Sequence, residues 1–139
     1  MLRMSTDAYQ VMLGHCYDGL PNEACGLIAG PASMASAAGA RASVTYPTAN
    51  TAASARVYTV EPRDHLRAER DAESRGLEIL GVFHSHTHTV AYPSPTDVAQ
   101  APDPNWHYVI VSLADDAPVV RSYRVVDGNI DEESVVLEG

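Results

Sequence analysis

The sequence contains no lysine, one tryptophan and one phenylalanine, and few positive charges of any kind. Its nine basic residues are all arginines and face 18 acidic residues, which gives a formal net charge of −9. This balance disfavours nucleic acid or an anionic membrane as a partner, because both are polyanions. It permits steering towards a basic protein surface, although solubility alone explains it.

Cysteine is too sparse for a disulfide framework, and Cys16 and Cys25 do not form a Cys-x-x-Cys metal site. Free cysteines fit a reducing compartment. Residues 1–7 lack the apolar core of a secretory signal. The uncharged run Ala24 to Ala40 is broken by glycine, proline and serine, which argues against a membrane span. We therefore expect a soluble, cytoplasmic protein.

The length of 139 residues predicts one domain over residues 1–139, and 45% hydrophobic content is typical of a globular chain. Hydrophobic periodicity and turn residues predict helices at 6–18, 61–75 and 94–101, and strands at 25–30, 43–46, 56–60, 79–86, 106–113, 119–126 and 129–137. The low-complexity segment Pro31 to Ala42 is predicted to be a mobile loop. This order predicts an α/β fold of the layered α+β kind, with a mixed, mostly antiparallel sheet flanked by helices.

Two histidines, His84 and His86, follow the apolar run Ile79 to Phe83 directly. Residues i and i+2 of a strand point to the same face, so the two imidazoles can close on one metal ion. Alternating histidines also occur on solvated faces. The apolar strand before them favours the metal, because the end of a central strand opens onto a cleft.

Ser94 and Asp97 belong to the sequence Ser-Pro-Thr-Asp, which is typical of a capped helix N-terminus. Capping explains both residues without any chemistry. The two roles are compatible, because an Asp in the first helical turn can lie at the same cleft and act as a third metal ligand. Three protein ligands with one open position are the arrangement of a catalytic zinc.

Glu23 precedes the predicted strand at 25–30. A single glutamate in a loop is usually a solvated charge. Hydrolysis at zinc, however, requires a carboxylate that takes a proton from the attacking water and gives it to the leaving amine.

Taken together, Glu23, His84, His86, Ser94 and Asp97 resemble the signature of the MPN+/JAMM zinc metalloproteases. The spacing His-x-His-x7-Ser-x2-Asp is far less expected by chance than any part of it. The resemblance implies the MPN/JAMM fold, whose layering is cytidine-deaminase-like. It also implies one Zn²⁺ per chain held by the two histidines and the aspartate, with the glutamate as general base and acid and the serine as oxyanion donor. Members of this family typically cleave the bond that follows the C-terminal glycines of a ubiquitin-like protein.

Segments 21–26, 84–98, 107–109 and 121–128 are similar to the small bacterial Mec-type members of this family. That similarity implies release of cysteine from the C-terminal Gly-Gly tail of a ubiquitin-like sulfur-carrier protein, as a step in cysteine biosynthesis. The short chain has no room for the long insertions with which deubiquitinating relatives hold ubiquitin chains.

Three alternatives remain to be weighed against this function. A general JAMM isopeptidase would act on other ubiquitin-like conjugates, and a non-catalytic MPN module would only bind them. A nucleoside deaminase requires His-x-Glu and Pro-Cys-x-x-Cys, and the sequence has neither. The sequence leaves the carrier and the oligomeric state open, and a homodimer is compatible with it.

Neighbouring residues offer further candidates. His88 continues the alternation of His84 and His86, but the family pattern uses Asp97, so we expect His88 at the rim of the cleft. Cys25 is interpreted as a packing residue of its strand. An amide at Asn50 is in a position to orient a neighbouring loop, and Tyr92 lies close enough in sequence to line the site.

Overall fold

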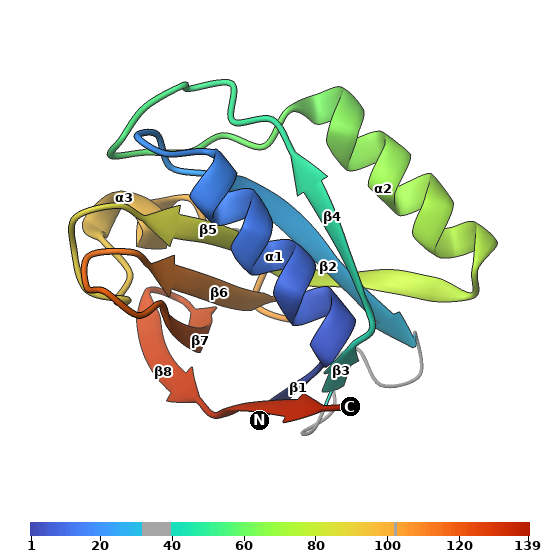
Figure 1. Cartoon of the computed structure of the whole chain (residues 1–139). Helices are drawn as coiled ribbons and strands as arrows, with labels where there is room; N and C mark the ends of the chain where they lie inside the picture. Colours follow the sequence, from blue (N-terminus) through green and yellow to red (C-terminus); the bar gives the residue numbers. More distant parts are fainter. Residues whose placement is uncertain (32–39, 102) are drawn as a thin grey trace.

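A computed structural model of the chain describes residues 1–31, 40–101 and 103–139, and its main feature is a six-stranded sheet (Figure 1). The strands lie in the order β4 (Val44–Thr48), β2 (Cys25–Pro31), β5 (Leu77–His86), β6 (His107–Ser112), β7 (Val119–Val126) and β8 (Asn129–Glu133). All neighbours are antiparallel except β5 and β6. The predicted α/β class with a mixed, mostly antiparallel sheet is confirmed.

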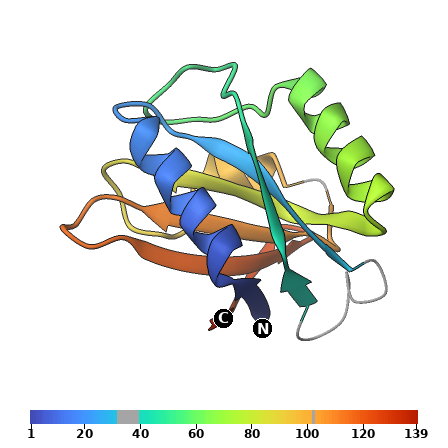
Figure 2. The same ribbon diagram turned by 45° about the vertical axis from the view of Figure 1, so that its right-hand side comes forward.

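Helices cover both faces of this sheet (Figure 2). Helix α1 (Thr6–Asp18) buries Ala8, Met12 and Cys16 on one face, whereas α2 (Pro62–Ser74) and α3 (Pro95–Ala99) pack on the other. Each helix begins at a side-chain cap, which accepts a backbone N–H that would otherwise lack a partner. No helix within the described residues has the length and apolar content needed to cross a membrane.

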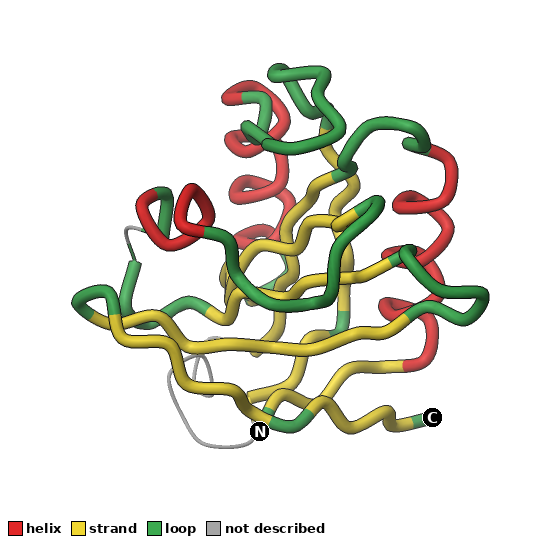
Figure 3. The backbone as a smooth tube through the Cα atoms, turned by 90° about the vertical axis from the view of Figure 1, so that its left-hand side faces the viewer, coloured by secondary structure: helices red, strands yellow, loops and turns green. Residues whose placement is uncertain are grey.

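A second, three-stranded parallel sheet was not predicted. It consists of β3 (Ala40–Ala42), β1 (Leu2–Ser5) and β9 (Val135–Glu138), with β1 in the middle, and it places the first and last strands of the chain side by side (Figure 3). The single strand predicted at 129–137 is therefore wrong, because the chain leaves β8 at Ser134 and joins the other sheet. The predicted loop at Pro31 to Ala42 is wrong at both ends, which lie in β2 and β3, and residues 32–39 are outside the described residues.

The strand predicted at 56–60 is also wrong. Val60 forms only an isolated bridge with Asn50, and the rest of the segment is irregular. The Asn50 side chain explains this: its amide donates to the Val57 carbonyl at 3.1 Å and its oxygen accepts the Thr59 N–H at 2.9 Å. The Asn50 side chain thus takes the Val57 and Thr59 backbone groups that a continuous ladder would need.

A β-bulge in β5 decides which face receives the histidines. The pairing with β2 shifts between Ile28, opposite Gly81, and Ala29, opposite Ile79, so Leu80 is the extra residue. An extra residue reverses the alternation of the following side chains. Val82 consequently packs on the side of α2 and α3, and the two histidines that follow at even positions share that side.

Replacement of Gly81 with alanine should destabilise the protein by at least about 2 kcal/mol, because a backbone clash cannot relax as a side chain does. A Cβ at this position would lie 1.9 Å from the His107 carbonyl oxygen of β6. Urea denaturation measures the effect. Gly14→Ala is the matched control: it lies on the exposed side of α1 with nothing within 4 Å, and should gain up to about 1 kcal/mol. Equal effects of both changes would contradict the close approach of β5 and β6.

A hydrogen-bonded pair of side chains, His107 and Glu133, joins β6 to β8. Glu133 accepts hydrogen bonds from His107 Nδ1 at 2.5 Å and Ser122 Oγ at 2.8 Å. Burial alone would raise the pKa of Glu133, but these partners hold the pKa at about 2. His107 therefore has a structural role, since it is fully buried and bonded to Glu133.

The folded-state pKa of Glu133 lies below its unfolded value, so its contribution to stability is present above about pH 4.5 and disappears as the pH falls towards 2. We expect Glu133→Gln to lose about 2 kcal/mol at pH 7, and this difference should fall to less than half at pH 3 and vanish near pH 2. Chemical denaturation at pH 7, 5 and 3 measures this. A constant difference at all three values would contradict the pKa shift.

Candidate active site

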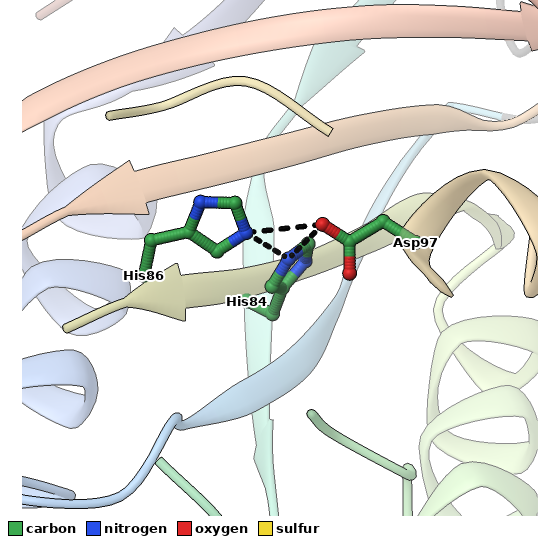
Figure 4. Close-up of side chains that lie close together, drawn as sticks. All are labelled: His84, His86 and Asp97. Carbon is green, nitrogen blue, oxygen red and sulfur yellow. Dashed lines mark hydrogen bonds and ion pairs between the residues drawn. The ribbon is translucent and has the colours of Figure 1, made fainter. Parts of the chain in front are cut away.

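Three side chains meet at the C-terminal end of β5 (Figure 4). The Nε2 atoms of His84 and His86 lie 3.1 Å apart, and Asp97 Oδ2 is 3.2 Å from the first and 3.0 Å from the second. All three residues are buried. In the described part of the chain this is the only group of three or more His, Cys, Asp or Glu side chains close enough to hold one metal ion.

The elements that carry these residues fix their positions. The histidines alternate along β5, which is paired on both sides, with β2 as far as His84 and with β6 as far as His86. Asp97 is held by a capping box at the start of α3: its N–H donates to Ser94 Oγ at 3.1 Å, and its Oδ2 accepts the Ser94 N–H at 2.9 Å. The capping role and the approach to the histidines therefore coexist in one side chain.

The geometry and the chemistry of this group fit a zinc ion. Ligands bound at about 2.0–2.1 Å in a tetrahedron lie roughly 3.3 Å apart, close to the separations observed here. His86 Nδ1 lies 2.8 Å from the Val90 carbonyl, which only accepts hydrogen bonds, so Nδ1 carries a proton and Nε2 is the nitrogen that faces Asp97 and is placed to bind a metal.

The charge states also suit metal binding. Burial lowers the pKa of His84, which favours the neutral imidazole that a metal requires. Burial would raise the pKa of Asp97, but the hydrogen bonds from His84 and His86 and from the Ser94 N–H hold it well below the usual range. Burial would lower the pKa of His86, but the hydrogen bonds to Asp97 and to the Val90 carbonyl raise it, so a metal ion that binds Nε2 displaces a proton.

Glu23 lies beside this group, just before β2, and is only 5% exposed. Burial raises its pKa to about 7, with the Asp97 charge acting in the same direction and His86 opposing it. Its Oε1 atom has no hydrogen-bond partner among the described residues. A buried carboxylate oxygen without a partner is rare and needs an explanation, and a pKa near 7 suits a group that exchanges protons.

A cleft of about 660 Å³ gives access to the group. Glu23, His86 and Ser94 line it together with two loop segments, Ala55–Arg56 and Thr87–Thr89. The Ser94 hydroxyl accepts a hydrogen bond from Asp97, which leaves its own proton available to a substrate in the cleft. The sequence-predicted residues Glu23, His84, His86, Ser94 and Asp97 are thus gathered at one place.

Residues 5–126 match the family of prokaryotic homologs of the JAB domain, Prok-JAB. The chain belongs to this family. Since the JAB domain is the MPN domain, the sequence resemblance is confirmed.

Two relatives align with most of the chain. The CysO-cysteine peptidase of Mycobacterium tuberculosis is 37% identical over 136 residues, which is 97% of this chain and 90% of the relative. The desampylase of Haloferax volcanii is 32% identical over 116 residues, 80% of each chain. Because these relatives are a peptidase and a desampylase, the prediction that this JAB-family chain is a hydrolase is confirmed.

Solved structures agree with the fold. A protein from Desulfitobacterium hafniense has a TM-score of 0.86 at 36% identity and covers 99% of this chain and 93% of its own. A JAB1/MPN domain protein from Archaeoglobus fulgidus has a TM-score of 0.63 at 14% identity, covering 99% of this chain and 97% of its own. The second likeness concerns the fold alone.

Some residues that support the site of this JAB-family chain were not found from the sequence. The Tyr58 ring stacks on His84 with centroids 4.2 Å apart, but the sequence assigns Tyr58 to a strand that does not form. Ser85, between the two histidines, accepts the Ala24 N–H at 2.8 Å and so ties the Glu23 segment to β5. The sequence did offer a signal for Ser85: as the residue between two histidines of one strand, it points to the opposite face of the sheet.

Other candidates lie around the site without joining the three-residue group. His88 is exposed at the cleft and contacts Thr87 Oγ1 at 2.7 Å. Cys25 is fully buried, and burial raises the pKa of its thiol to about 11, as suits a packing residue. The Asn50 amide donates to the Glu23 carbonyl at 2.9 Å and so orients that segment. Tyr92 is half exposed and packs edge-on against Tyr123 rather than lining the cleft.

Proposed function

We propose that this protein is a cytoplasmic, zinc-dependent peptidase that releases cysteine from the C-terminal glycine of a ubiquitin-like sulfur-carrier protein. The observation that carries the metal chemistry is the convergence of two imidazole nitrogens and one carboxylate oxygen within 3.2 Å beside a buried glutamate. The 37% identity to CysO-cysteine peptidase over 97% of the chain supports the proposed substrate.

His84, His86 and Asp97 would hold the zinc ion. When bound, the ion supplies Lewis acidity, which polarises the scissile carbonyl and makes the attacking water more acidic. Glu23 takes the proton of this water as the new C–O bond forms. The Ser94 hydroxyl donates a hydrogen bond to the negative charge that develops on the carbonyl oxygen. As the C–N bond breaks, Glu23 returns the proton to the leaving nitrogen.

The cleft favours hydrolysis over simple binding. A module that only binds conjugates has no need of a buried glutamate whose pKa is raised to about 7, since burial of such a carboxylate costs stability. The walls at Ala55–Arg56 and Thr87–Thr89 leave the approach to Glu23 and Ser94 open for an extended tail.

A second function is favoured by the desampylase relative, namely cleavage of an isopeptide bond between a ubiquitin-like protein and lysine.

The test uses one carrier protein in two forms, ending in Gly-Gly-Cys or joined through its last glycine to a lysine side chain. Mass spectrometry follows the loss of cysteine or lysine, with and without a chelator. We expect release of cysteine that the chelator stops and re-added zinc restores. Faster cleavage of the lysine conjugate would instead identify an isopeptidase, and cleavage of neither would identify a binding module.

A further inference from the structure

Among the described residues, Arg56 is the only arginine that lines the cleft, and its side chain is exposed. Most arginines of the described chain have acidic partners, as Arg75 does with Asp71 at 2.9 Å. The Arg56 guanidinium, in contrast, makes no ion pair or hydrogen bond with the described residues. A cation without a partner beside a catalytic group is available for an anionic part of the substrate.

The backbone around Arg56 is held in place from both sides. The Arg56 N–H donates to Ser54 Oγ at 3.0 Å, and the preceding carbonyl, of Ala55, accepts the Thr87 hydroxyl at 3.3 Å. The following carbonyl, of Val57, accepts the Asn50 amide at 3.1 Å. These bonds fix the base of the Arg56 side chain relative to β5. Because the Asn50 amide also donates to the Glu23 carbonyl, they fix it relative to the Glu23 segment as well.

The chemistry of the leaving group explains what such a cation can recognise. When a single amino acid is released, its α-carboxylate carbon lies roughly 2.5 Å from the scissile nitrogen, so a group that binds the carboxylate must line the same cleft as the catalytic residues. A lysine side chain released from an isopeptide bond has methylene groups at the corresponding place. Guanidinium binds carboxylate through two parallel hydrogen bonds and gains nothing from methylenes.

We propose that Arg56 binds the free α-carboxylate of the leaving amino acid and so makes the enzyme selective for a scissile bond that is followed by one C-terminal residue. This inference rests on the proposed peptidase function. It assigns the choice between a C-terminal amino acid and a lysine conjugate to one side chain of the loop 50–57.

The test compares a carrier that ends in Gly-Gly-Cys with the same carrier ending in a cysteine carboxamide, which lacks only the negative charge. Wild-type kcat/KM should favour the free carboxylate by about tenfold, mainly through KM, because the contact forms before the reaction and persists through it. Arg56→Gln should lose this preference and use the two substrates equally. Arg56→Lys should keep part of it. Arg70→Gln, which removes an exposed arginine of α2, should keep all of it.

Binding provides a second readout. In the Glu23→Gln background, calorimetry should show that only chains with Arg56 bind the carboxylate form more tightly than the carboxamide. Retention of the preference in Arg56→Gln, or equal use of both substrates by the wild type, would overturn the role of Arg56 and leave the peptidase function standing. Failure of the wild type to cleave either substrate would overturn the peptidase function, and the role of Arg56 with it.

Discussion

Glu23→Gln should lose about 10²–10⁴-fold in kcat and keep its zinc, because the amide preserves the shape of the side chain but cannot accept a proton. Glu23 is buried beside the three-residue group without belonging to it, and one of its oxygens has no partner. Elemental analysis measures the metal, and single-turnover cleavage of the carrier measures the rate. Glu73→Gln, an equal change of charge on the exposed side of α2, should leave both unchanged.

The stability of the same variant separates a chemical role from a structural one. The pKa of Glu23 in the metal-free protein is raised to about 7, so the folded state binds a proton more tightly than the unfolded state does. Stability from this group is present below about pH 4.5 and is lost as the pH rises through 7. Glu23→Gln should therefore be more stable than the metal-free wild type at pH 8, by about 1–3 kcal/mol. If Glu23→Gln kept wild-type activity, whatever its stability, the role of Glu23 in proton transfer would be refuted.

Ser94→Gly should reduce kcat by about 10²–10³-fold while the helix cap survives. Glycine is tolerated at an N-cap at a cost of only a few tenths of a kcal/mol. The bond from the Ser94 backbone N–H to Asp97 Oδ2 needs no side chain, so it persists and continues to hold the aspartate. The fall in kcat then measures only what the Ser94 hydroxyl contributes as a hydrogen-bond donor to the developing oxyanion.

Ser94→Thr is the control, because it keeps the hydroxyl and the cap. It should retain most of the activity, and thermal melting should show that all three proteins are folded. If Ser94→Gly lost its zinc or turned over as fast as the wild type, the oxyanion role would be wrong. In the first case Ser94 would act through the position of Asp97, and in the second it would be a cap alone.

The residues of the site could be predicted because their chemistry is local in the sequence. His84 and His86 share a strand, and Ser94 and Asp97 share one helical turn, so spacing alone brings each pair together. Glu23 could be assigned only through the family resemblance, because no local rule places a residue that precedes one strand beside the end of another strand. The contact forms because Ala24 and Cys25 lie next to Ser85 and His84 across the β2–β5 pair.

The parts that could not be predicted depend on contacts between distant segments. The bulge at Leu80 turns the histidines towards α3, yet nothing in the apolar run Ile79 to Phe83 indicates an extra residue. The pairing of β1 with β9 joins residues more than 130 positions apart. The segment at 56–60 has the composition of a strand, but the Asn50 side chain takes its backbone groups and leaves Tyr58 free to stack on His84.

The most direct test of the central claim is a zinc titration of the metal-stripped protein, with release of cysteine from the carrier as the readout. The account predicts no release without metal, a linear rise on addition of zinc, and a sharp end at one equivalent per chain. Asp97→Asn, which removes the anionic ligand but keeps the side-chain shape, should need far more zinc for the same rate. Full activity of the stripped wild type, or a titration that Asp97→Asn leaves unchanged, would contradict a metal held by His84, His86 and Asp97.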